Sequence, residues 1–440
     1  MTEQQDDIFC GAHGCVLKYC CLQDECINGI NKITKIFFNE TDRNEEVETY
    51  KTINLNSIDK ELQYFIGDAV SCDINIEKIT DSNLIKIAEK MNTTTDELKE
   101  NNTVFNGISY TDGGLSLIKY IQKLTSIAEH IELLKYLKNV FDGIQILHSN
   151  GIYHLDLKPD NIVIGEINNI TTCRLIDFGD SFQSEYTKQT GISKTKQKQL
   201  LKNNRSKLSE RLTNKDKIGT LEYMSPEMFI LSHKTLRQEL GKNNINIENK
   251  NRFIEGQQSE IDSNYLPIVD DYSSNLKHYI NNILRTNIIE TRIDYFNIIE
   301  ELKSDIKILT PETVRIKYNK SDIWSLGIIL VFIYSLMEQN IKEDQEQKES
   351  ILNLLKTLIL KLLIINPTKR PDASESVKLY NEFIEELNGK INTNNIKGGY
   401  KSKHNKSKHN KSKHNKSKHN KSKHNKSKNN KTKKTNLYKI

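Results

Sequence analysis

The stretch YHLDLKPDN, residues 153–161, brings a carboxylate, a lysine and an asparagine close together along the chain. Asp156 could accept the proton of an attacking hydroxyl, and the ammonium of Lys158 could neutralise a transferring phosphoryl group. Carboxylate and amide oxygens bind Mg²⁺, and Asn161 is followed sixteen residues later by Asp177 in the sequence IDFGD. These residue types in this order predict magnesium-assisted phosphoryl transfer, with Asn161 and Asp177 as metal ligands.

A segment near the N-terminus could cover the phosphates of a nucleotide. In GAHGCV, residues 11–16, Gly11 and Gly14 would let backbone amides approach phosphate oxygens, while Val16 would pack on the base. Phe9 stands where a first glycine of such a loop would be, so an ordinary strand turn is the alternative interpretation of this segment.

A lysine on the third predicted strand could supply a positive charge to these phosphates. We assign this role to Lys35 in KITKIFF, with Lys32 as the near alternative. The acid expected to pair with it is Glu46, because apolar residues follow it one, four and seven positions on, along one face of a predicted helix. Glu45 and Glu48 compete for this pairing.

The elements that must position these residues form a strand-rich first part and a helix-rich second part. β-branched and aromatic residues favour strands within residues 8–38 and at 103–110, and an inserted helical piece is expected at 81–100. Beyond residue 115, apolar residues recur at helical spacing. Helices are expected at 115–124, 131–151, 323–337 and 351–365, and short strands at 162–164 and 173–176. The apolar run 323–337 is shorter than a membrane span needs, which favours a buried core helix.

Three further motifs follow the two already described. They are GTLEYMSPE at 219–227, SDIWSLGIIL at 321–330 and NPTKRPDA at 366–373. With all five motifs in order, the chain resembles a eukaryotic-type protein kinase over roughly residues 8–385.

The resemblance implies an α+β fold with two lobes, a small β-rich N-lobe and a larger α-helical C-lobe, with insertions and a disordered basic tail. The N-lobe would cover residues 1–112, the C-lobe 113–390 and the tail 391–440. A long activation segment would run from 177 to 227, followed by an insertion around 228–321.

The resemblance also assigns an activity. Lys158 and Thr220 stand as they do in serine/threonine kinases, where the threonine contacts the catalytic aspartate and lysine and helps to seat the acceptor. The reaction implied is transfer of the γ-phosphoryl group of ATP, with Mg²⁺, to Ser or Thr hydroxyls of a protein substrate. The catalytic residues would be Asp156, Lys158 and Thr220.

Several structural roles follow from position in the family. Ile108 would guard the back of the ATP pocket, and Ser109–Thr111 would form the hinge whose backbone bonds adenine. Asp322 would brace the backbone of the catalytic loop, and Arg370 would form an ion pair with Glu227.

One departure concerns activation. Leu155 stands where most of the family has an arginine that grips a phosphate on the activation loop, and leucine cannot do so. All the groups expected to touch ATP, metal or hydroxyl are present, which favours an active kinase that does not need this phosphate switch. The rival interpretation is a weak or inactive pseudokinase that acts as a binding scaffold. The activation segment between Ser181 and Gly219 contains ten Lys or Arg residues, which form either a docking surface or a solvated insertion.

The charge of the chain is divided between two regions. The net charge is +6, but residues 401–440 contain 16 Lys and no acid, which leaves 48 basic against 58 acidic residues in 1–400, a net charge of −10. The tail is built on five copies of KSKHN and has no apolar repeat to bury, so we expect it to be disordered, with a hinge at 396–400. It could bind nucleic acid or another polyanion, bind metal loosely through its histidines, or be a solvated repeat.

Cysteine usage and the N-terminus favour an intracellular, cytoplasmic protein. The start MTEQQDDIFC lacks a basic and apolar leader. Five of the seven cysteines lie at Cys10, Cys15, Cys20, Cys21 and Cys26, and none of these has the spacing of a zinc ribbon. We therefore expect reduced thiols, with a metal or redox site as the alternative. The composition, repeats and insertions resemble those of kinases from giant DNA viruses or AT-rich protists.

Overall fold

The structure is a computed structural model. It describes residues 8–10, 14–18, 32–183, 219–232, 277–285 and 311–399. The chain divides into two compact units, Met1–Lys390 and Ile391–Ile440, and the fold below is that of the first. The expectations for Gly11, for residues 184–218 of the activation segment, for most of the insertion that follows it, and for the repeat tail lie outside the described residues.

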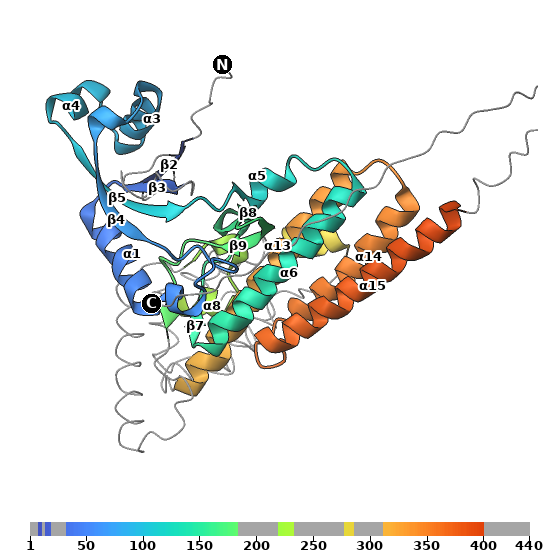
Figure 1. The fold of residues 1–440 in the computed structure, drawn as a ribbon. Helices are drawn as coiled ribbons and strands as arrows, with labels where there is room; N and C mark the ends of the chain where they lie inside the picture. Colours follow the sequence, from blue (N-terminus) through green and yellow to red (C-terminus); the bar gives the residue numbers. More distant parts are fainter. Residues whose placement is uncertain are drawn as a thin grey trace, which may run out of the picture. The chain divides into compact units, whose positions relative to one another are not determined.

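Five antiparallel strands form the sheet of the N-lobe, drawn in blue in Figure 1. Their order is β1-β2-β3-β5-β4, so β5 is flanked on both edges. The strands are β1 (Phe9–Cys10), β2 (Gly14–Leu17), β3 (Lys32–Phe37), β4 (Val70–Asn75) and β5 (Val104–Thr111). The strands expected within 8–38 and at 103–110 are thereby confirmed.

Helix α1 (Glu40–Ile53) contacts strands β3 and β5 and carries the acid predicted to pair with a lysine. Asn39 caps its start, since its side-chain oxygen accepts a hydrogen bond from the Asp42 N–H at 2.7 Å. The helix ends at Asn54, whose left-handed backbone (φ 46°) is of the kind that stops a helix. A short helix α2 (Leu55–Ile58) follows.

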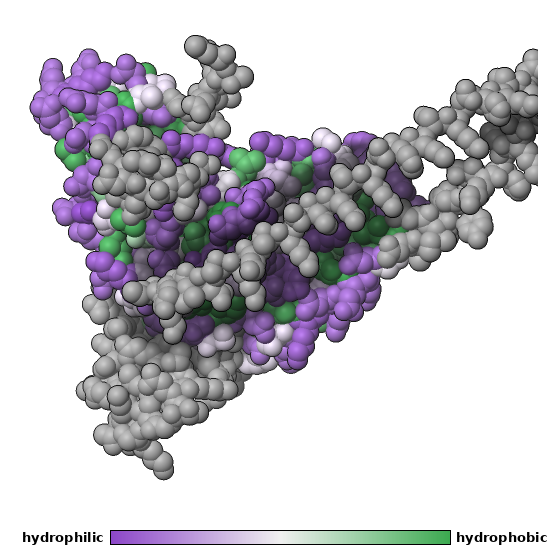
Figure 2. Space-filling model, viewed as in Figure 1, coloured by the Kyte–Doolittle hydropathy of each residue, from purple (hydrophilic) through white to green (hydrophobic). Residues whose placement is uncertain are grey.

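Two additional helices stand between β4 and β5, and they confirm the inserted helical piece. They are α3 (Asp81–Met91) and α4 (Thr95–Glu100), preceded by a 3-10 turn at Ile76–Lys78. Leu84, Ile87 and Leu98 are buried in one apolar cluster with residues of the sheet. Their outer surface is mostly hydrophilic, as Figure 2 shows over α3 and α4. The insertion therefore adds a small core to the face of the sheet opposite the site.

The C-lobe is built from long helices that run side by side in Figure 1. The helices of the C-lobe are α5 (Leu117–Ile121), α6 (Ile127–Ser149), α8 (Pro226–Ser232), α13 (Pro311–Asn340), α14 (Gln345–Leu362) and α15 (Ala373–Gly399), with a π-helical turn at Lys277–Asn282. Ser126 and Glu129 form a capping box at the start of α6. α15 extends to Gly399, within the segment 396–400 where a hinge was predicted. The bilobal α+β fold itself is confirmed.

One segment of α13, Lys320–Asn340, is long and apolar enough to cross a membrane by composition alone. Most of it is buried within the protein, and Trp324 is fully enclosed. This burial supports the predicted core helix, since such a helix satisfies the same length and hydropathy test.

Short strands hold the loops that carry the chemistry. The strands are β6 (Leu115–Ser116), β7 (Ile152–Tyr153), β8 (Ile162–Ile167), β9 (Ile170–Leu175) and β10 (Phe182–Gln183). The loop with the predicted catalytic residues runs from β7 to β8, and Asp177 follows β9. Because β8 and β9 form an antiparallel hairpin, these two loops meet at one end of it, where the N–H of Ile176 donates to the Asn161 carbonyl at 3.0 Å.

Candidate active site

Four of the predicted residues meet in one cluster of hydrogen bonds at the catalytic loop. The ammonium of Lys158 donates to Asp156 Oδ2 at 2.7 Å and to Thr220 Oγ1 at 2.9 Å. The Thr220 hydroxyl donates to Asp156 Oδ1 at 2.7 Å. The Asn161 amide donates to the Asp156 carbonyl at 2.8 Å and to its Oδ2 at 3.0 Å. Both oxygens of Asp156 are thus oriented by neighbours, and the Asn161 amide oxygen is left for another ligand.

The backbone of this loop is held by a buried aspartate of α13, as the sequence predicted. Asp322 accepts the N–H of His154 and the N–H of Leu155, both at 2.9 Å, and also contacts His148 Nε2 at 2.8 Å. Burial opposes ionisation of this carboxyl, but the hydrogen bond from His148 and the charges of His148 and His154 outweigh it and lower the pKa of Asp322. An ionised Asp322 can accept both loop amides at once.

Leu155 occupies a strained position against the end of the activation segment. Its φ is +66°, a left-handed conformation that costs a β-carbon-bearing residue about 1–2 kcal/mol. Gly219 has a φ of +80°, and a Cβ there would fall 2.5 Å from the Leu155 carbonyl oxygen. Only glycine fits this close approach, which brings the next residue, Thr220, to Asp156.

A second cluster joins the N-lobe sheet to α1 and to the loop after β9. Lys35 Nζ lies 2.6 Å from Glu46 Oε2 and 3.6 Å from Asp177 Oδ1. Glu45 and Glu48, the two competing acids, are exposed. The pairing left open by the sequence is therefore Lys35 with Glu46.

The charges of this cluster support one another. Desolvation would lower the pKa of Lys35, but the carboxylates of Asp177 and Glu46 outweigh it and raise that pKa above its ordinary value. Desolvation likewise opposes ionisation of Asp177, yet the charges of Lys35 and Lys158 hold the pKa of Asp177 below its usual range. Burial raises the pKa of Glu46, against the opposing charge of Lys35. Asp177 is therefore ready as an anionic ligand.

Aromatic rings connect α1 to the catalytic loop. The ring centroids of Tyr50 and Phe178 lie 5.8 Å apart, and those of Phe178 and His154 lie 4.9 Å apart. Phe178 is fully buried between them. The stack fixes the backbone on either side of Asp177, since edge and tilted ring contacts tolerate little displacement in a packed interior.

The hinge predicted at Ser109–Thr111 is not where the structure allows one. Ser109 lies within β5, opposite Thr34 of β3 and Val70 of β4, so its backbone belongs to the central ladder. The N–H of Thr111 donates to Asp68 Oδ1 at 3.0 Å. Neither residue presents a vacant backbone donor for adenine, and both assignments are corrected. β5 ends at Thr111, one residue beyond the strand expected at 103–110.

The residue that reaches α1 from β5 is Tyr110, which sequence reasoning missed in favour of Ile108. Ile108 lies opposite Lys35 in the ladder, whereas the Tyr110 hydroxyl donates to Glu46 Oε1 at 2.5 Å. The available signal was alternation, because residues 108 and 110 share one face of the strand with Lys35. A buried tyrosine hydroxyl on that face requires a partner, and Glu46 is that partner.

Part of the predicted phosphate cover is described. Val16 lies directly opposite Lys35 in the β2–β3 ladder, so both side chains share the face of the sheet that carries the site. A Cβ at residue 14 would fall 1.9 Å from the Ile36 carbonyl oxygen, so Gly14 is required by the close approach of β3. Gly11 lies outside the described residues.

The two N-terminal cysteines that the structure describes differ from the expectation of reduced thiols. Cys10 and Cys15 face each other across β1 and β2 and form a disulfide. Cys72 of β4 is also disulfide-bonded, whereas Cys173 is a free, buried thiol. Residues paired across a hairpin lie within bonding reach whatever their sequence spacing, so the spacing of metal-site cysteines does not indicate such a pair.

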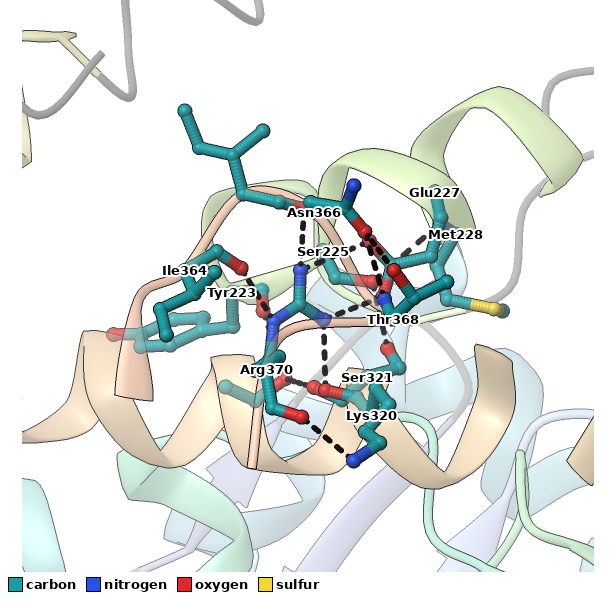
Figure 3. A network of polar contacts seen from close by, with 12 residues as sticks. Tyr223, Ser225, Glu227, Met228, Lys320, Ser321, Ile364, Asn366, Thr368 and Arg370 are labelled. Carbon is teal, nitrogen blue, oxygen red and sulfur yellow. Dashed lines mark hydrogen bonds and ion pairs between the residues drawn. The ribbon is translucent and has the colours of Figure 1, made fainter. Parts of the chain in front are cut away.

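The end of the activation segment is fixed to the C-lobe by the network in Figure 3. Arg370 forms a bidentate ion pair with Glu227 at 2.5 and 3.1 Å, as predicted, and both side chains are fully buried. The guanidinium also donates to the carbonyls of Ile364 and Lys320, each at 2.8 Å. These hydrogen bonds offset the free-energy penalty of burying the charge pair, and they hold the start of α8 in place.

The site can be tested for its fit to magnesium. Among the described residues, no cluster of three or more His, Cys, Asp or Glu side chains could cage a metal. Asn161 and Asp177 nevertheless lie on two loops that are joined by the hydrogen bond from the Ile176 N–H to the Asn161 carbonyl, and they offer an amide and a carboxylate. Mg²⁺ typically takes few protein ligands and completes its shell with water and phosphates, so this donor pair fits it.

The chain is similar to known protein kinases over part of its length. Residues 32–240 match the family model described as protein kinase domain. The chain is 27% identical over 154 residues to CBL-interacting protein kinase 15 of Oryza sativa subsp. japonica, covering 34% of this chain and 32% of that protein. It is 36% identical over 98 residues to inhibitor of nuclear factor kappa-B kinase subunit alpha of Danio rerio, covering 22% and 10%.

The matched region and the two lobes are those of a bilobal protein-kinase-like fold. The chain spans about a third or less of the length of these curated relatives. The likeness therefore concerns the kinase domain, and the names of the similar proteins are those of kinases.

Proposed function

We propose that this protein is a serine/threonine protein kinase that transfers the γ-phosphoryl group of ATP to a protein hydroxyl with Mg²⁺. The observation that carries the proposal is the closed triangle of Asp156, Lys158 and Thr220. It unites a base, a phosphate-neutralising cation and a hydroxyl that orients both. The names of the similar kinases agree with this activity.

Each residue of the candidate site has a role in this reaction. Asp156 accepts the proton of the acceptor hydroxyl as it attacks, and Lys158 lies beside it to offset the negative charge that moves during transfer. Lys35, held by Glu46, binds phosphate oxygens of the nucleotide. Asn161 and Asp177 would hold Mg²⁺, which neutralises and orients the phosphates when bound. Gly14 and Val16 belong to the strand that covers them.

We further propose that the activation segment is ordered without the arginine-mediated phosphate switch. Its beginning is supported by the pairing of Phe182 with Tyr153 and by the Ser181 hydroxyl on the His154 carbonyl at 3.3 Å. The beginning and the end also meet, because the Gly219 N–H donates to Asp180 Oδ2 at 3.1 Å. These contacts would order the activation segment in place of a pairing between an arginine and a phosphate, which the uncharged Leu155 cannot make.

The test is phosphoryl transfer by the purified chain from labelled ATP to an array of Ser- and Thr-containing peptides. We expect transfer that is abolished by chelation of Mg²⁺ and unchanged, within about twofold, after phosphatase treatment. A change of tenfold or more after phosphatase would show that the segment depends on phosphate after all. The pseudokinase alternative predicts nucleotide binding with no turnover in the same preparation.

The basic tail carries a separate proposal, that it binds nucleic acid or another polyanion. The supporting observation is the charge division, 16 Lys without an acid in 401–440 against a body of net charge −10. Removing residues 401–440 should abolish salt-sensitive retention on DNA while leaving phosphoryl transfer unchanged. Equal retention of the full and shortened chains would contradict the proposal.

A further inference from the structure

Tyr110 is a buried tyrosine whose hydroxyl contacts the carboxylate that pairs with Lys35. Only 7% of Tyr110 is exposed, and its hydroxyl lies 2.5 Å from Glu46 Oε1. The other oxygen of the same carboxylate, Oε2, lies 2.6 Å from Lys35 Nζ. The two oxygens are therefore held from two different strands, β5 and β3, which fixes the rotation as well as the position of the carboxylate.

The environment of the Tyr110 hydroxyl favours its protonated form, which donates a hydrogen bond. Burial, followed by the nearby charge of Glu46, raises the pKa of Tyr110 well above its ordinary value. A protonated hydroxyl offers its hydrogen to the carboxylate, and a hydrogen bond to a charged acceptor is stronger than one between neutral groups. The geometry and the raised pKa of the hydroxyl agree with Tyr110 as the donor of this hydrogen bond.

The ring of Tyr110 also contacts Tyr50, which links it to Phe178 in the loop after β9. Its centroid lies 5.6 Å from that of Tyr50, which in turn contacts Phe178 through its ring, while the Phe178 N–H lies 3.5 Å from the Tyr50 hydroxyl. Tyr110 therefore meets α1 twice, at Glu46 and one turn later at Tyr50. These two contacts favour the position of α1 close to β3 and β5. Movement of α1 away from the sheet would break the contacts of Tyr110 with Glu46 and with Tyr50.

We propose that Tyr110 is a positioning residue that holds Glu46 against Lys35 before nucleotide binds. In this role it stabilises the inward position of α1 from within the N-lobe, where a phosphate on the activation loop is not needed. The inference deepens the proposed function and rests on it for its effect on turnover. Its effect on nucleotide affinity can be measured even if no acceptor is phosphorylated.

The experiment is a double-mutant cycle with Tyr110→Phe, Glu46→Gln and the double variant in the full chain. We expect Tyr110→Phe to lower kcat/KM for ATP about tenfold, as the loss of one charge-assisted hydrogen bond predicts. In the Glu46→Gln background the same change should lower it less than twofold, because the carboxylate through which Tyr110 acts is gone. Mg-ATP affinity by calorimetry should follow the same pattern.

A matched control separates positioning from stability. Tyr380 is also a fully buried tyrosine, whose hydroxyl donates to the Leu134 carbonyl in the C-lobe. Tyr380→Phe should lower the melting temperature without altering the ATP dependence of turnover. Equal losses from Tyr110→Phe with and without Glu46→Gln would overturn the proposal. Absence of turnover in all variants, with the coupling retained in ATP affinity, would overturn the kinase activity and leave the positioning role intact.

Discussion

The catalytic loop and strand β5 both contribute to the candidate active site, yet their geometry arises in different ways. In the loop, the partners Asp156, Lys158 and Asn161 lie within a few residues of one another, so local spacing dictates their contacts. In β5, position depends on pairing with β3, where Lys35 meets Ile108 across the sheet. A motif of local contacts can be assigned from sequence, whereas a strand register is decided by distant partners.

The largest effect is expected in the catalytic loop. Asp156→Asn keeps the shape and the bond from Lys158 but removes the base, so we expect transfer to fall by about 10²–10⁴-fold. Mg-ATP affinity should stay within a few-fold of the wild type. The measurement is single-turnover transfer beside calorimetry, and near-normal turnover would remove Asp156 from the proposed mechanism.

Two lysines of β3 offer a matched test of the sheet. Lys35→Ala should reduce kcat/KM for ATP by about 100-fold, because both carboxylates beside it lose their cation. Lys32 pairs with Asp68 instead, so Lys32→Ala should retain transfer and lower the free energy of unfolding by about 1 kcal/mol. Steady-state kinetics and urea unfolding distinguish them, and equal kinetic losses would mean that the register has been misassigned.

The brace of the loop predicts a dependence of stability on pH. The pKa of Asp322 is lower in the folded than in the unfolded protein, so its ionised form stabilises the fold above its ordinary pKa of about 4, and this contribution is lost as the pH falls through the folded value. Asp322→Asn should cost about 3 kcal/mol at neutral pH. It should also flatten the acid side of the stability profile, measured by urea unfolding between pH 3 and 7 as rough limits. An unchanged acid side would assign that dependence to other groups.

The smallest expected effect concerns the side chain of Ser109. The Ser109 hydroxyl is buried and has no hydrogen-bond partner among the described residues. Ser109→Ala should therefore leave ATP affinity unchanged and should be neutral or slightly stabilising, since an unsatisfied buried hydroxyl carries a penalty. A clear loss of affinity would return Ser109 to the nucleotide site.

The same contrast explains how much could be predicted from the sequence. The loop triangle, the Asp322 brace and the Arg370–Glu227 ion pair follow from motifs whose partners the family order already indicates. The hinge was assigned from position in the family, whereas the ladder with β3 places Ser109 within β5. Tyr110 was missed for the same reason, since its partner lies 64 positions away in the chain.

The place of β5 in the sheet also has a consequence for how the N-lobe forms during synthesis. β5 lies between β3 and β4 but is made after both of them, with α3 and α4 emerging in between. Until residue 111 has left the ribosome, β3 lacks one neighbour and β4 lacks its partner. Non-local pairing of this kind is slow and leaves strand edges exposed. The two inserted helices, which bury part of the same core, can cover the waiting strand while its partner is being made.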